Sequence, residues 1–278
     1  MMLRFVLATL LTLGALPAQA IECRLALLLA MDVSSSVDEA EDALQRGGMV
    51  AALTAPEVTR AFFSSDLPVA LAVFEWSGRY NQKVLLDWTL INNQSDLLFA
   101  AQTLATSARS QTEFPTAMGY ALGYGAGMFK RAPPCLRQTL DMAGDGENNE
   151  GFPPSSAYKA FPFDAVTING LVINAADFEA ETNLIPYYQN EVIRGPGAFI
   201  EVAQGFEDYE RAMRRKLERE LAMQAIGALY KHQTETSNSR FESPEKVPST
   251  PLSVTRRQDR SIDVADLIGP ISLDALQR

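Results

Sequence analysis

Histidine is almost absent from this sequence, which has one, His232, in 278 residues. Nucleophilic systems of the Ser-His-Asp or Cys-His kind need a histidine next to the nucleophile. His232 lies at the start of a polar C-terminal segment. This shortage excludes both kinds of nucleophile, and it also excludes a histidine-rich zinc site.

Basic residues are also in short supply. The chain has 24 Lys and Arg against 34 Asp and Glu, which gives a formal net charge of −10. An acidic surface repels a polyanion, so this balance excludes a protein that binds nucleic acid by neutralising phosphates. Hydrophobic residues make up 47% and charged residues 21% of the chain, which is ordinary for a globular protein with an apolar core.

A long apolar run is missing everywhere except at the N-terminus. Residues 1–20 combine one arginine, an apolar run from Phe5 to Leu16 and the tripeptide Ala18-Gln19-Ala20, the pattern of a secretory signal peptide cleaved after Ala20. The run is shorter than the ~20 residues of a membrane-spanning helix, so an uncleaved anchor is the less favoured alternative. We therefore expect a periplasmic or secreted protein with no transmembrane segment after cleavage.

Composition divides the chain into three parts. After the signal peptide at 1–20, we expect a folded domain over 21–228 and a polar tail over 229–278. From His232 to Ser261 the tail is rich in Ser, Thr, Pro, Glu and Arg and has scarcely an apolar cluster, so we expect it to be disordered.

Short apolar runs alternate with segments of helical periodicity along the domain. The expected strands are 25–31, 69–74, 84–88, 136–142, 166–173 and 199–202, and the expected helices are 40–53, 95–106, 116–129 and 206–221. Only residues 77–82 separate the second strand from the third, so we expect a hairpin there. The pattern predicts an α/β fold with a doubly wound, mostly parallel six-stranded sheet, one antiparallel edge strand and helices on both faces.

The first expected strand ends in Asp32, and Ser34 and Ser36 follow at intervals of two residues. In an open α/β sheet, ligands bind at this carboxyl end of the strands. A carboxylate and two hydroxyls on a tight turn are hard oxygen donors, which suit Mg²⁺ or Mn²⁺ better than Zn²⁺. Helix capping is a compatible alternative for part of the motif, because Ser36 to Glu39 has the pattern of a capping box.

Two further oxygen donors follow or precede other expected elements. Asp145 lies between Gly144 and Gly146 after the fourth strand, where a simple turn is the alternative interpretation. Thr116 opens a helix after Pro115, where an ordinary N-cap is the alternative. At the carboxyl end of the sheet, Asp145 would face the first motif.

Together, these residues resemble the metal-ion-dependent adhesion site (MIDAS) of the von Willebrand factor type A domain. That family has Asp-x-Ser-x-Ser after its first strand, Thr-x-x-Gly-x-Ala-Leu at a helix start and Asp-Gly after its fourth strand. The chain is more similar still to a branch of secreted bacterial proteins with this fold and without an assigned function. The segments that carry this second likeness are 75–76, 144–149, 167–171 and 195–199, and it covers about residues 24–224.

The resemblance implies a divalent metal, Mg²⁺ first with Mn²⁺ and Ca²⁺ as alternatives. The implied ligands are Asp32, Ser34, Ser36, Thr116 and Asp145. In the family, an acidic side chain from a partner protein fills the last coordination position, so the implied function is a metal-dependent protein-binding module for adhesion or as a scaffold. One departure is Phe114-Pro115, which stands where the family usually has Gly-Gly before the threonine.

Four neighbours of these motifs are candidates for the rim of the site, namely Glu75, Trp76, Asn148 and Asn149. Tryptophan at a strand end is more often a core residue, whereas Glu75 is harder to bury without a partner. We expect Asn148 and Asn149 to orient ligands or waters.

Export to an oxidising compartment favours a disulfide between the two cysteines of the chain, Cys23 and Cys135. In the type A sheet the first and fourth strands are neighbours and run in the same direction. Cys23 lies nine residues before Asp32, and Cys135 lies ten before Asp145. The resemblance therefore places both cysteines at the edge of the sheet opposite the metal.

Two other functions stay open. Residues 144–149 also resemble the metal loop of phosphatases of the haloacid-dehalogenase type, but that family's first strand ends in Asp-x-Asp where this chain has Asp32 and Ser34, and Asn149 replaces the last aspartate of the loop. Losing both carboxylates removes a general acid and a metal ligand, so we expect no catalysis. A structural envelope protein with a vestigial site is the other alternative, and it would show no metal dependence.

Overall fold

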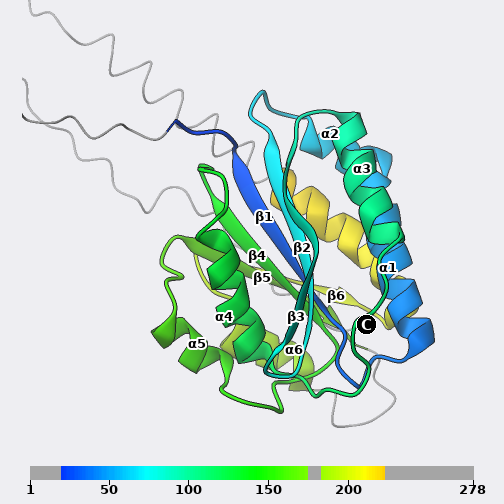
Figure 1. The fold of residues 1–278 in the computed structure, drawn as a ribbon, viewed down its shortest axis with the longest axis vertical. Helices are drawn as coiled ribbons and strands as arrows, with labels where there is room; N and C mark the ends of the chain where they lie inside the picture. The colour runs from blue at the N-terminus through cyan, green and yellow to red at the C-terminus, as the bar shows by residue number, and fades with distance from the viewer. Residues whose placement is uncertain (1–19, 175–182, 223–278) are drawn as a thin grey trace, which may run out of the picture. The chain divides into compact units, whose positions relative to one another are not determined.

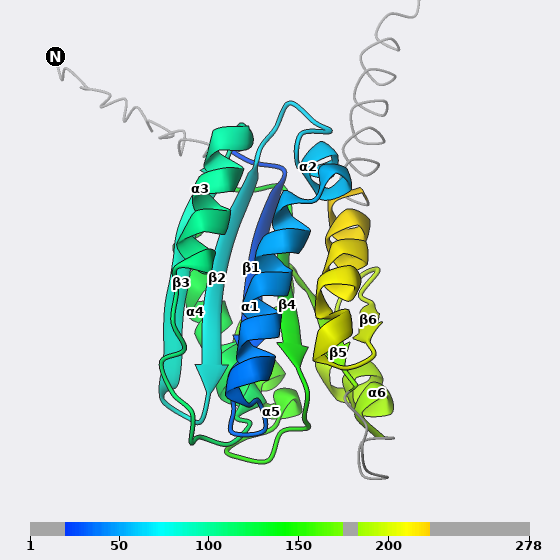
Figure 2. The same ribbon diagram turned by 90° about the vertical axis from the view of Figure 1, so that its right-hand side faces the viewer.

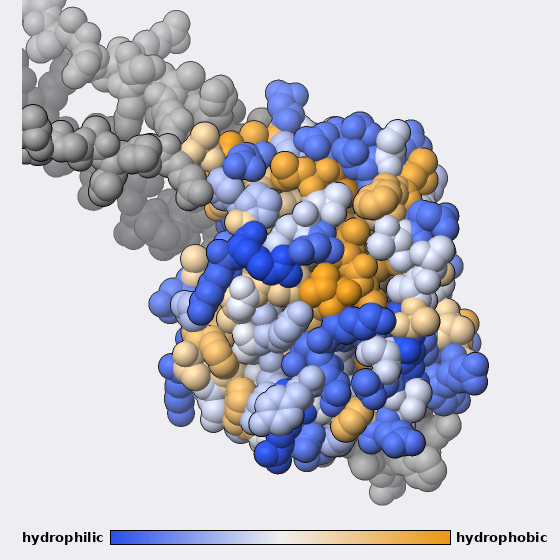
Figure 3. All heavy atoms as spheres, viewed as in Figure 1, coloured by the Kyte–Doolittle hydropathy of each residue, from blue (hydrophilic) through white to orange (hydrophobic). Residues whose placement is uncertain are grey.

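The computed structural model describes residues 20–174 and 183–222. The expected signal peptide and the polar tail over 229–278 lie outside these residues, apart from Ala20. Within them, no helix is long and apolar enough to cross a membrane. Figure 3 shows that hydrophilic residues cover most of one face of the molecule.

One six-stranded sheet forms the centre of the fold, with the strand order β3-β2-β1-β4-β5-β6 (Figure 1). The strands are β1 (Leu25–Asp32), β2 (Val69–Ser77), β3 (Asn81–Ile91), β4 (Gln138–Gly144), β5 (Val166–Ile173) and β6 (Ile200–Ala203). Every pairing is parallel except that of β2 with β3, which is an antiparallel hairpin. The predicted fold class and the predicted hairpin are therefore confirmed.

Helices cover both faces of the sheet, as Figure 2 shows. On one face lie α1 (Glu39–Thr54), α2 (Pro56–Phe62), α3 (Gln94–Ala105) and a C-terminal helix whose described part is 209–222. On the other lie α4 (Met118–Phe129), α5 (Pro154–Ala160) and α6 (Leu184–Tyr187), which continues into a π-helix over Tyr188–Val192. Each face encloses its own apolar core.

The strand β1 shows why its sequence is a continuous apolar run. All eight of its residues are buried, and successive side chains point to opposite faces of the sheet. Leu27 and Leu29 enter the core under α1, whereas Ala26 and Leu28 enter the core under α4. A central parallel strand covered on both faces has no solvent side, and so it has no polar alternation.

The start of α1 corrects one expectation. Asp38, not Ser36, is the N-cap of this helix, because its side chain accepts a hydrogen bond from the N–H of Glu41 at 2.8 Å. The Glu41 carboxylate accepts from the Asp38 N–H in return, which completes a capping box two residues later than predicted. The capping box predicted over Ser36 to Glu39 was therefore wrong, and the Ser36 hydroxyl is left for another role.

A disulfide joins Cys23 to Cys135, as predicted, with the two Cα atoms 4.5 Å apart. The two residues pair as an isolated parallel bridge just before β1 and β4, at the end of these strands opposite Asp32. Because the bond closes a loop with a sequence separation of 112 residues, the chain-entropy estimate of its contribution is about 4 to 5 kcal/mol, as an upper figure. It fastens the start of the described chain to the core.

A buried group of charged side chains attaches the C-terminal helix to the sheet. The ammonium of Lys216 lies 2.9 Å from a carboxylate oxygen of Asp141 on β4 and 2.8 Å from one of Glu220, and all three side chains are at most 1% exposed. Asn169 on β5 donates to Glu220 at 2.7 Å. Burial raises the pKa of Asp141 to about 7; the charge of Lys216 opposes this rise and that of Glu220 adds to it.

This raised pKa predicts an unusual pH dependence of stability. Between pH ~4, where Asp141 titrates in the unfolded chain, and pH ~7, the folded chain binds the proton more tightly, so this residue lowers the free energy of unfolding as the pH rises, by about 1.4 kcal/mol per unit. We expect Asp141→Asn to remove this contribution, so that stability falls less steeply as the pH rises, while the raised pKa of Asp32 keeps its own contribution. Urea denaturation of both proteins at several pH values in this range, with chelator present, measures it.

A matched control is Asp208→Asn. The hydrogen bond from Arg211 lowers the pKa of Asp208, so this residue contributes to stability above its unfolded pKa and loses that contribution only in more acidic solution. The slope between pH ~4 and ~7 should therefore survive in Asp208→Asn. A slope that is the same in Asp141→Asn and in the wild type would contradict the prediction.

Candidate functional site

The candidate site begins where β1 ends. Asp32 is the last residue of the strand, and a tight turn carries Ser34 and Ser36 before α1 starts. The backbone N–H of Ser34 donates to Asp32 Oδ1 at 2.8 Å, which folds the turn back onto the strand end. The hydroxyl oxygens of Ser34 and Ser36 then lie 3.1 Å apart. All three side chains of the first predicted motif are thus brought together.

Asp145 reaches the same place from β4. The parallel register pairs Met31 with Ala143, so the two strands end side by side. The Ser36 hydroxyl donates to Asp145 Oδ1 at 2.9 Å. Gly144 makes this approach possible, because a Cβ atom there would lie 2.9 Å from Asp32 Oδ2. The glycine before Asp145 therefore serves close packing as well as the turn.

Thr116 completes the group, since its hydroxyl donates to Ser34 Oγ at 3.2 Å. The segment before it is anchored through its carbonyls: that of Phe114 accepts from the Ser35 N–H at 2.8 Å, and that of Pro115 accepts from the Gly78 N–H at 2.7 Å. The Phe-Pro pair that replaces the usual glycines thus leaves Thr116 in reach of the serines. The helix α4 starts two residues later than expected, at Met118.

The two asparagines after β4 hold Thr116 and α4 in place. The Asn149 side chain accepts from the Thr116 N–H at 2.9 Å, and the Asn149 N–H donates back to the Thr116 carbonyl at 3.0 Å. The Asn148 side chain accepts from the Gly119 N–H at 3.3 Å. Their side-chain oxygens therefore position the backbone of this helix start, rather than the ligands or waters that we expected them to orient.

The other two rim candidates are buried. Trp76 is fully buried and belongs to the core under α4. Glu75 is also fully buried and points to the opposite face of β2, where it binds Arg46 of α1 and accepts from the Ser110 N–H at 2.9 Å. Neither residue lies on an exposed rim, because the alternation along β2 directs one side chain into each core.

The site has a buried floor and an open mouth. Asp32 and Ser34 are fully buried and Thr116 is 3% exposed, whereas Ser36 is exposed and Asp145 is partly exposed. Burial raises the pKa of Asp32 well above its usual range, and the negative charge of Asp145 raises it further. A second oxygen of the buried carboxylate, Asp32 Oδ2, is without a hydrogen-bond partner among the described residues.

These features fit a hard divalent cation. Two carboxylates and three hydroxyls converge, and a cation would both neutralise the carboxylates and satisfy Asp32 Oδ2. In the part of the chain that the structure describes, no group of three or more His, Cys, Asp or Glu side chains is placed to hold a metal. The candidate site therefore depends on hydroxyl oxygens, and a nitrogen- or sulfur-rich zinc set is not what these residues offer.

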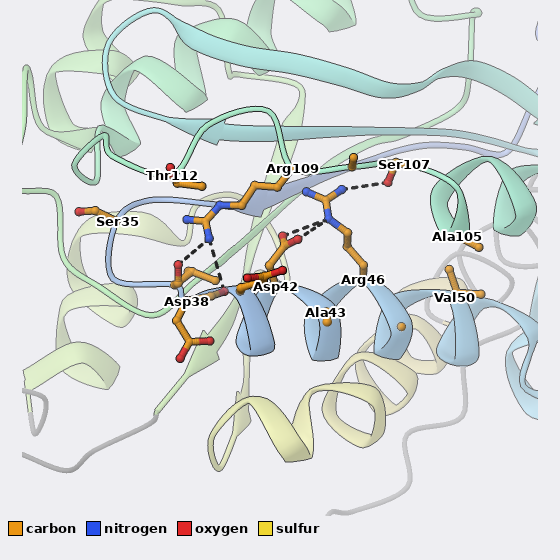
Figure 4. A pocket seen from close by; sticks show the side chains of 14 residues that line it. Ser35, Asp38, Asp42, Ala43, Arg46, Val50, Ala105, Ser107, Arg109 and Thr112 are labelled. Atoms are coloured by element: carbon orange, nitrogen blue, oxygen red, sulfur yellow. Dashed lines mark hydrogen bonds and ion pairs between the residues drawn. The ribbon is translucent and has the colours of Figure 1, made fainter.

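Arg109 is a functional residue that the sequence analysis missed. It lies after α3, and its guanidinium donates to the carbonyls of Val33 at 2.9 Å, Ser34 at 2.8 Å and Val37 at 2.7 Å, with a longer contact to that of Asp38 at 3.4 Å. Its Nε–H donates to another carbonyl, of Gln111, at 2.7 Å. A guanidinium has five N–H donors, and here they all reach carbonyls, most of them in the turn that carries the serines. Figure 4 shows Arg109 reaching the backbone beside Asp38.

A groove of about 830 Å³ lies behind this turn, between α1 and the segment after α3. Figure 4 shows that Arg109 and Arg46 both line it, with Asp38 and Asp42 on the α1 side. Both arginines are engaged: Arg46 binds Asp42 and also the Ser107 hydroxyl at 2.9 Å. The lining of the groove thus includes Arg109, whose hydrogen bonds support the serine turn.

Comparisons with known proteins agree with this geometry. Residues 22–225 match the family model described as "Protein of unknown function (DUF1194)". No curated protein matches the sequence. Among solved structures, the chain is similar to proximal thread matrix protein 1 (PTMP1) from the mussel byssus, with 14% identity and a TM-score of 0.51 over 74% of this chain and 49% of that one. One structure of the mussel protein has a zinc-occupied MIDAS motif.

Two bacterial surface proteins are also similar in structure. The pilus adhesin SpaC from Lactobacillus rhamnosus GG matches with 13% identity and a TM-score of 0.53, over 73% of this chain and 31% of that one. A mutant of the PilB minor pilin from Streptococcus sanguinis matches with 11% identity and a TM-score of 0.52, over 76% and 64%. The chain thus spans about half the length of the mussel protein and less of the adhesin. At these identities the likeness shows the fold, which is the predicted von Willebrand type A-like fold.

The contacts of Arg109 predict that the serine turn depends on it. Lysine has three donors in place of five and cannot span several carbonyls in one plane. In Arg109→Lys we expect the backbone amides of residues 33–38 to exchange hydrogen about tenfold faster, which corresponds to ~1.4 kcal/mol of local stability. Hydrogen exchange followed by mass spectrometry measures this change.

Arg79→Lys provides the control, because Arg79 is an exposed arginine at the same end of the sheet that pairs with Glu150 and makes none of these contacts. Its substitution should leave the exchange of residues 33–38 unchanged. Equal protection of this turn in the wild type and in Arg109→Lys would show that the carbonyl contacts are dispensable.

Proposed function

The chain belongs to the DUF1194 family, and from this premise we propose that it is a metal-dependent protein-binding module that uses a MIDAS-type site. The observation that carries the proposal is the convergence of Asp32, Ser34, Ser36, Thr116 and Asp145 at the carboxyl end of β1 and β4. These five residues provide hard oxygen donors from three separate segments of the chain. The site is buried on one side and is open to solvent at Ser36 and Asp145.

Mg²⁺ is the metal that we propose first, with Mn²⁺ and Ca²⁺ as alternatives. Ser34, Ser36 and Thr116 would hold it through hydroxyls, while Asp32 and Asp145 would contribute carboxylate charge. When bound, the cation supplies a Lewis-acidic position that accepts one more oxygen ligand from outside the protein. A zinc-occupied MIDAS motif in the mussel relative supports a divalent ion in this kind of site.

The partner that we propose is another protein that presents an acidic side chain. Three of the five donors are neutral hydroxyls, which offset less of the cation's charge than carboxylates in those positions would, so the bound cation still attracts a foreign carboxylate to its open coordination position. The formal net charge of −10 works against this attraction at long range, which makes recognition a local contact at the site. The structural likeness to a pilus adhesin supports a binding role over an enzymatic one.

The phosphatase alternative is weaker on the geometry of the same residues. The position of its general acid is occupied by Ser34, a fully buried side chain that is held by two other hydroxyls. The position of its last loop aspartate is Asn149, whose side-chain oxygen accepts from the Thr116 N–H. We therefore propose that the site binds without turnover. The other alternative, a structural envelope protein with a vestigial site, differs by having no affinity for metal.

The wider organisation is part of the proposal. A signal peptide over 1–20 would direct the chain to the periplasm or the medium, the binding domain would occupy 21–228, and 229–278 would follow as a polar tail. The disulfide between Cys23 and Cys135 supports an oxidising location, because such bonds persist mainly outside the cytosol.

Calorimetric titration tests the metal site directly. For the protein starting at Ile21, stripped with chelator, we expect Mg²⁺ to bind at one site. Ser36→Ala should weaken this binding by about tenfold or more, equivalent to ~1.4 kcal/mol, and Asp32→Asn should remove measurable binding because it deletes the buried negative charge. Ser36 is exposed, so its variant should fold normally.

Glu147→Gln is the matched control for charge. Glu147 is exposed and lies two residues after Asp145, so its substitution removes a nearby negative charge but no proposed ligand. Its Mg²⁺ affinity should stay close to that of the wild type. A wild-type protein that gives no binding heat with Mg²⁺, Mn²⁺ or Ca²⁺ would refute the metal site and favour the vestigial alternative.

Metal-dependent capture tests the partner. Immobilised protein incubated with envelope extract in Mg²⁺ should retain a partner that chelator releases and that Ser36→Ala fails to retain. Replacing acidic residues of the captured protein by their amides should identify one carboxylate whose loss reduces retention about tenfold or more. A bound protein that is retained equally with chelator, or equally by Ser36→Ala, would count against the proposed mode of binding.

A further inference from the structure

A buried tyrosine lies directly beneath the candidate site. Tyr188 is the first residue of the π-helix over Tyr188–Val192 and is fully buried. Its ring occupies a slot that two glycines leave open on neighbouring strands. A Cβ atom at Gly170 on β5 would lie 2.6 Å from the ring, and one at Gly144 on β4 would lie 2.8 Å from the phenol oxygen. No residue other than glycine at these positions would admit the tyrosine without displacement.

The phenol oxygen of Tyr188 and the carboxylate of Asp32 face the same small space. The point where a Cβ atom of Gly144 would lie is 2.8 Å from Tyr188 Oη and 2.9 Å from Asp32 Oδ2. Both oxygens are buried, and both are without a hydrogen-bond partner among the described residues. Leaving two such atoms unsatisfied carries the full desolvation penalty of each group. A hydrogen bond that links the Tyr188 phenol to Asp32 Oδ2 would avoid that cost.

The pKa of the Tyr188 phenol is consistent with its closeness to Asp32. Burial raises the pKa of the Tyr188 phenol well above its usual range, and the negative charge of Asp32 raises it further, ahead of Asp145. A phenol is a hydrogen-bond donor at neutral pH in any case. On its other side, Asp32 Oδ1 already accepts from the Ser34 N–H at 2.8 Å. The two oxygens of this carboxylate thus have different neighbours, one from the serine turn and one from the core.

We propose that Tyr188 is a positioning residue for Asp32, whose second oxygen it holds by a hydrogen bond from the phenol through one water. This inference rests on the proposed function, because it concerns the affinity of the metal site. With the Ser34 N–H on one oxygen and the phenol on the other, the carboxylate plane is fixed before a cation arrives. Binding of the cation then costs less conformational entropy, because the Asp32 side chain is already ordered.

The test is Tyr188→Phe, which removes one oxygen and preserves the ring that fills the slot. We expect its Mg²⁺ affinity, measured by calorimetry, to fall about tenfold or more. The metal-free stability should fall slightly, because the hydrogen bond that links the phenol to Asp32 is lost. A purely structural tyrosine would give lower stability with unchanged Mg²⁺ affinity.

Tyr209→Phe is the matched control. Tyr209 is also fully buried, and its hydroxyl is also unpaired among the described residues, but its ring belongs to the core under α1, on the other face of the sheet. Its Mg²⁺ affinity should equal that of the wild type. The ultraviolet difference spectrum of tyrosine on addition of Mg²⁺ should be retained in Tyr209→Phe and lost in Tyr188→Phe.

The outcomes separate this inference from the proposed function. Wild-type Mg²⁺ binding with equal affinity in Tyr188→Phe overturns the role of Tyr188 and leaves the metal site standing. Equal losses of affinity in Tyr188→Phe and Tyr209→Phe overturn it as well, because the effect is then general to buried hydroxyls. A wild-type protein that binds no divalent cation overturns both proposals.

Discussion

The parallel register between β1 and β4 is the constraint on which the rest of the molecule depends. At one end of this strand pair it places Cys23 beside Cys135, and at the other it places Asp32 beside Gly144 and Asp145. A shift of one residue would turn the side chains of β1 to the opposite faces of the sheet, moving leucines and alanines between two differently shaped cores. The covalent bond at one end and the two packed cores therefore fix the geometry of the oxygen cluster at the other.

The buried charged groups around Lys216 and around Asp32 have different roles. Under the C-terminal helix, Lys216 neutralises its acidic neighbours within the protein, so this group is closed and attaches a helix to the sheet. Around Asp32, the neighbouring side chains are hydroxyls and a second carboxylate, so the negative charge is left in need of a cation. Among the described residues, Asp32 has no buried lysine like the one beside Asp141, so its negative charge is less fully compensated within the protein.

Much of the fold could be predicted from the sequence because its signals are local. Continuous apolar runs mark the buried strands, and β5 has the bounds that its run predicts. The placement of Asp32, Ser34, Ser36 and Asp145 could be predicted because the ends of parallel strands meet at one edge of the sheet, whereas Thr116 joined the set through the resemblance to the type A family. The N-cap of α1 was misplaced because Ser36 and Asp38 are both suitable N-cap residues, and the contact of Ser36 with Asp145, distant in sequence, distinguishes them. Arg109, Asn149 and Tyr188 were missed or misread for the same reason: each acts through a tertiary contact made by an unremarkable residue in sequence.

The way in which Arg109 holds the serine turn has a consequence for how this protein can vary. Its guanidinium donates to main-chain carbonyls, which every amino acid has. These contacts therefore do not depend on which side chains the turn carries. Ser35 is exposed in this turn, so a change of its side chain leaves the hydrogen bonds of Arg109 to the main chain in place. In the proposed binding module, affinity for the cation would then depend on Ser34 and Ser36, and preference among partners on exposed neighbours such as Ser35, so that the two properties could change independently.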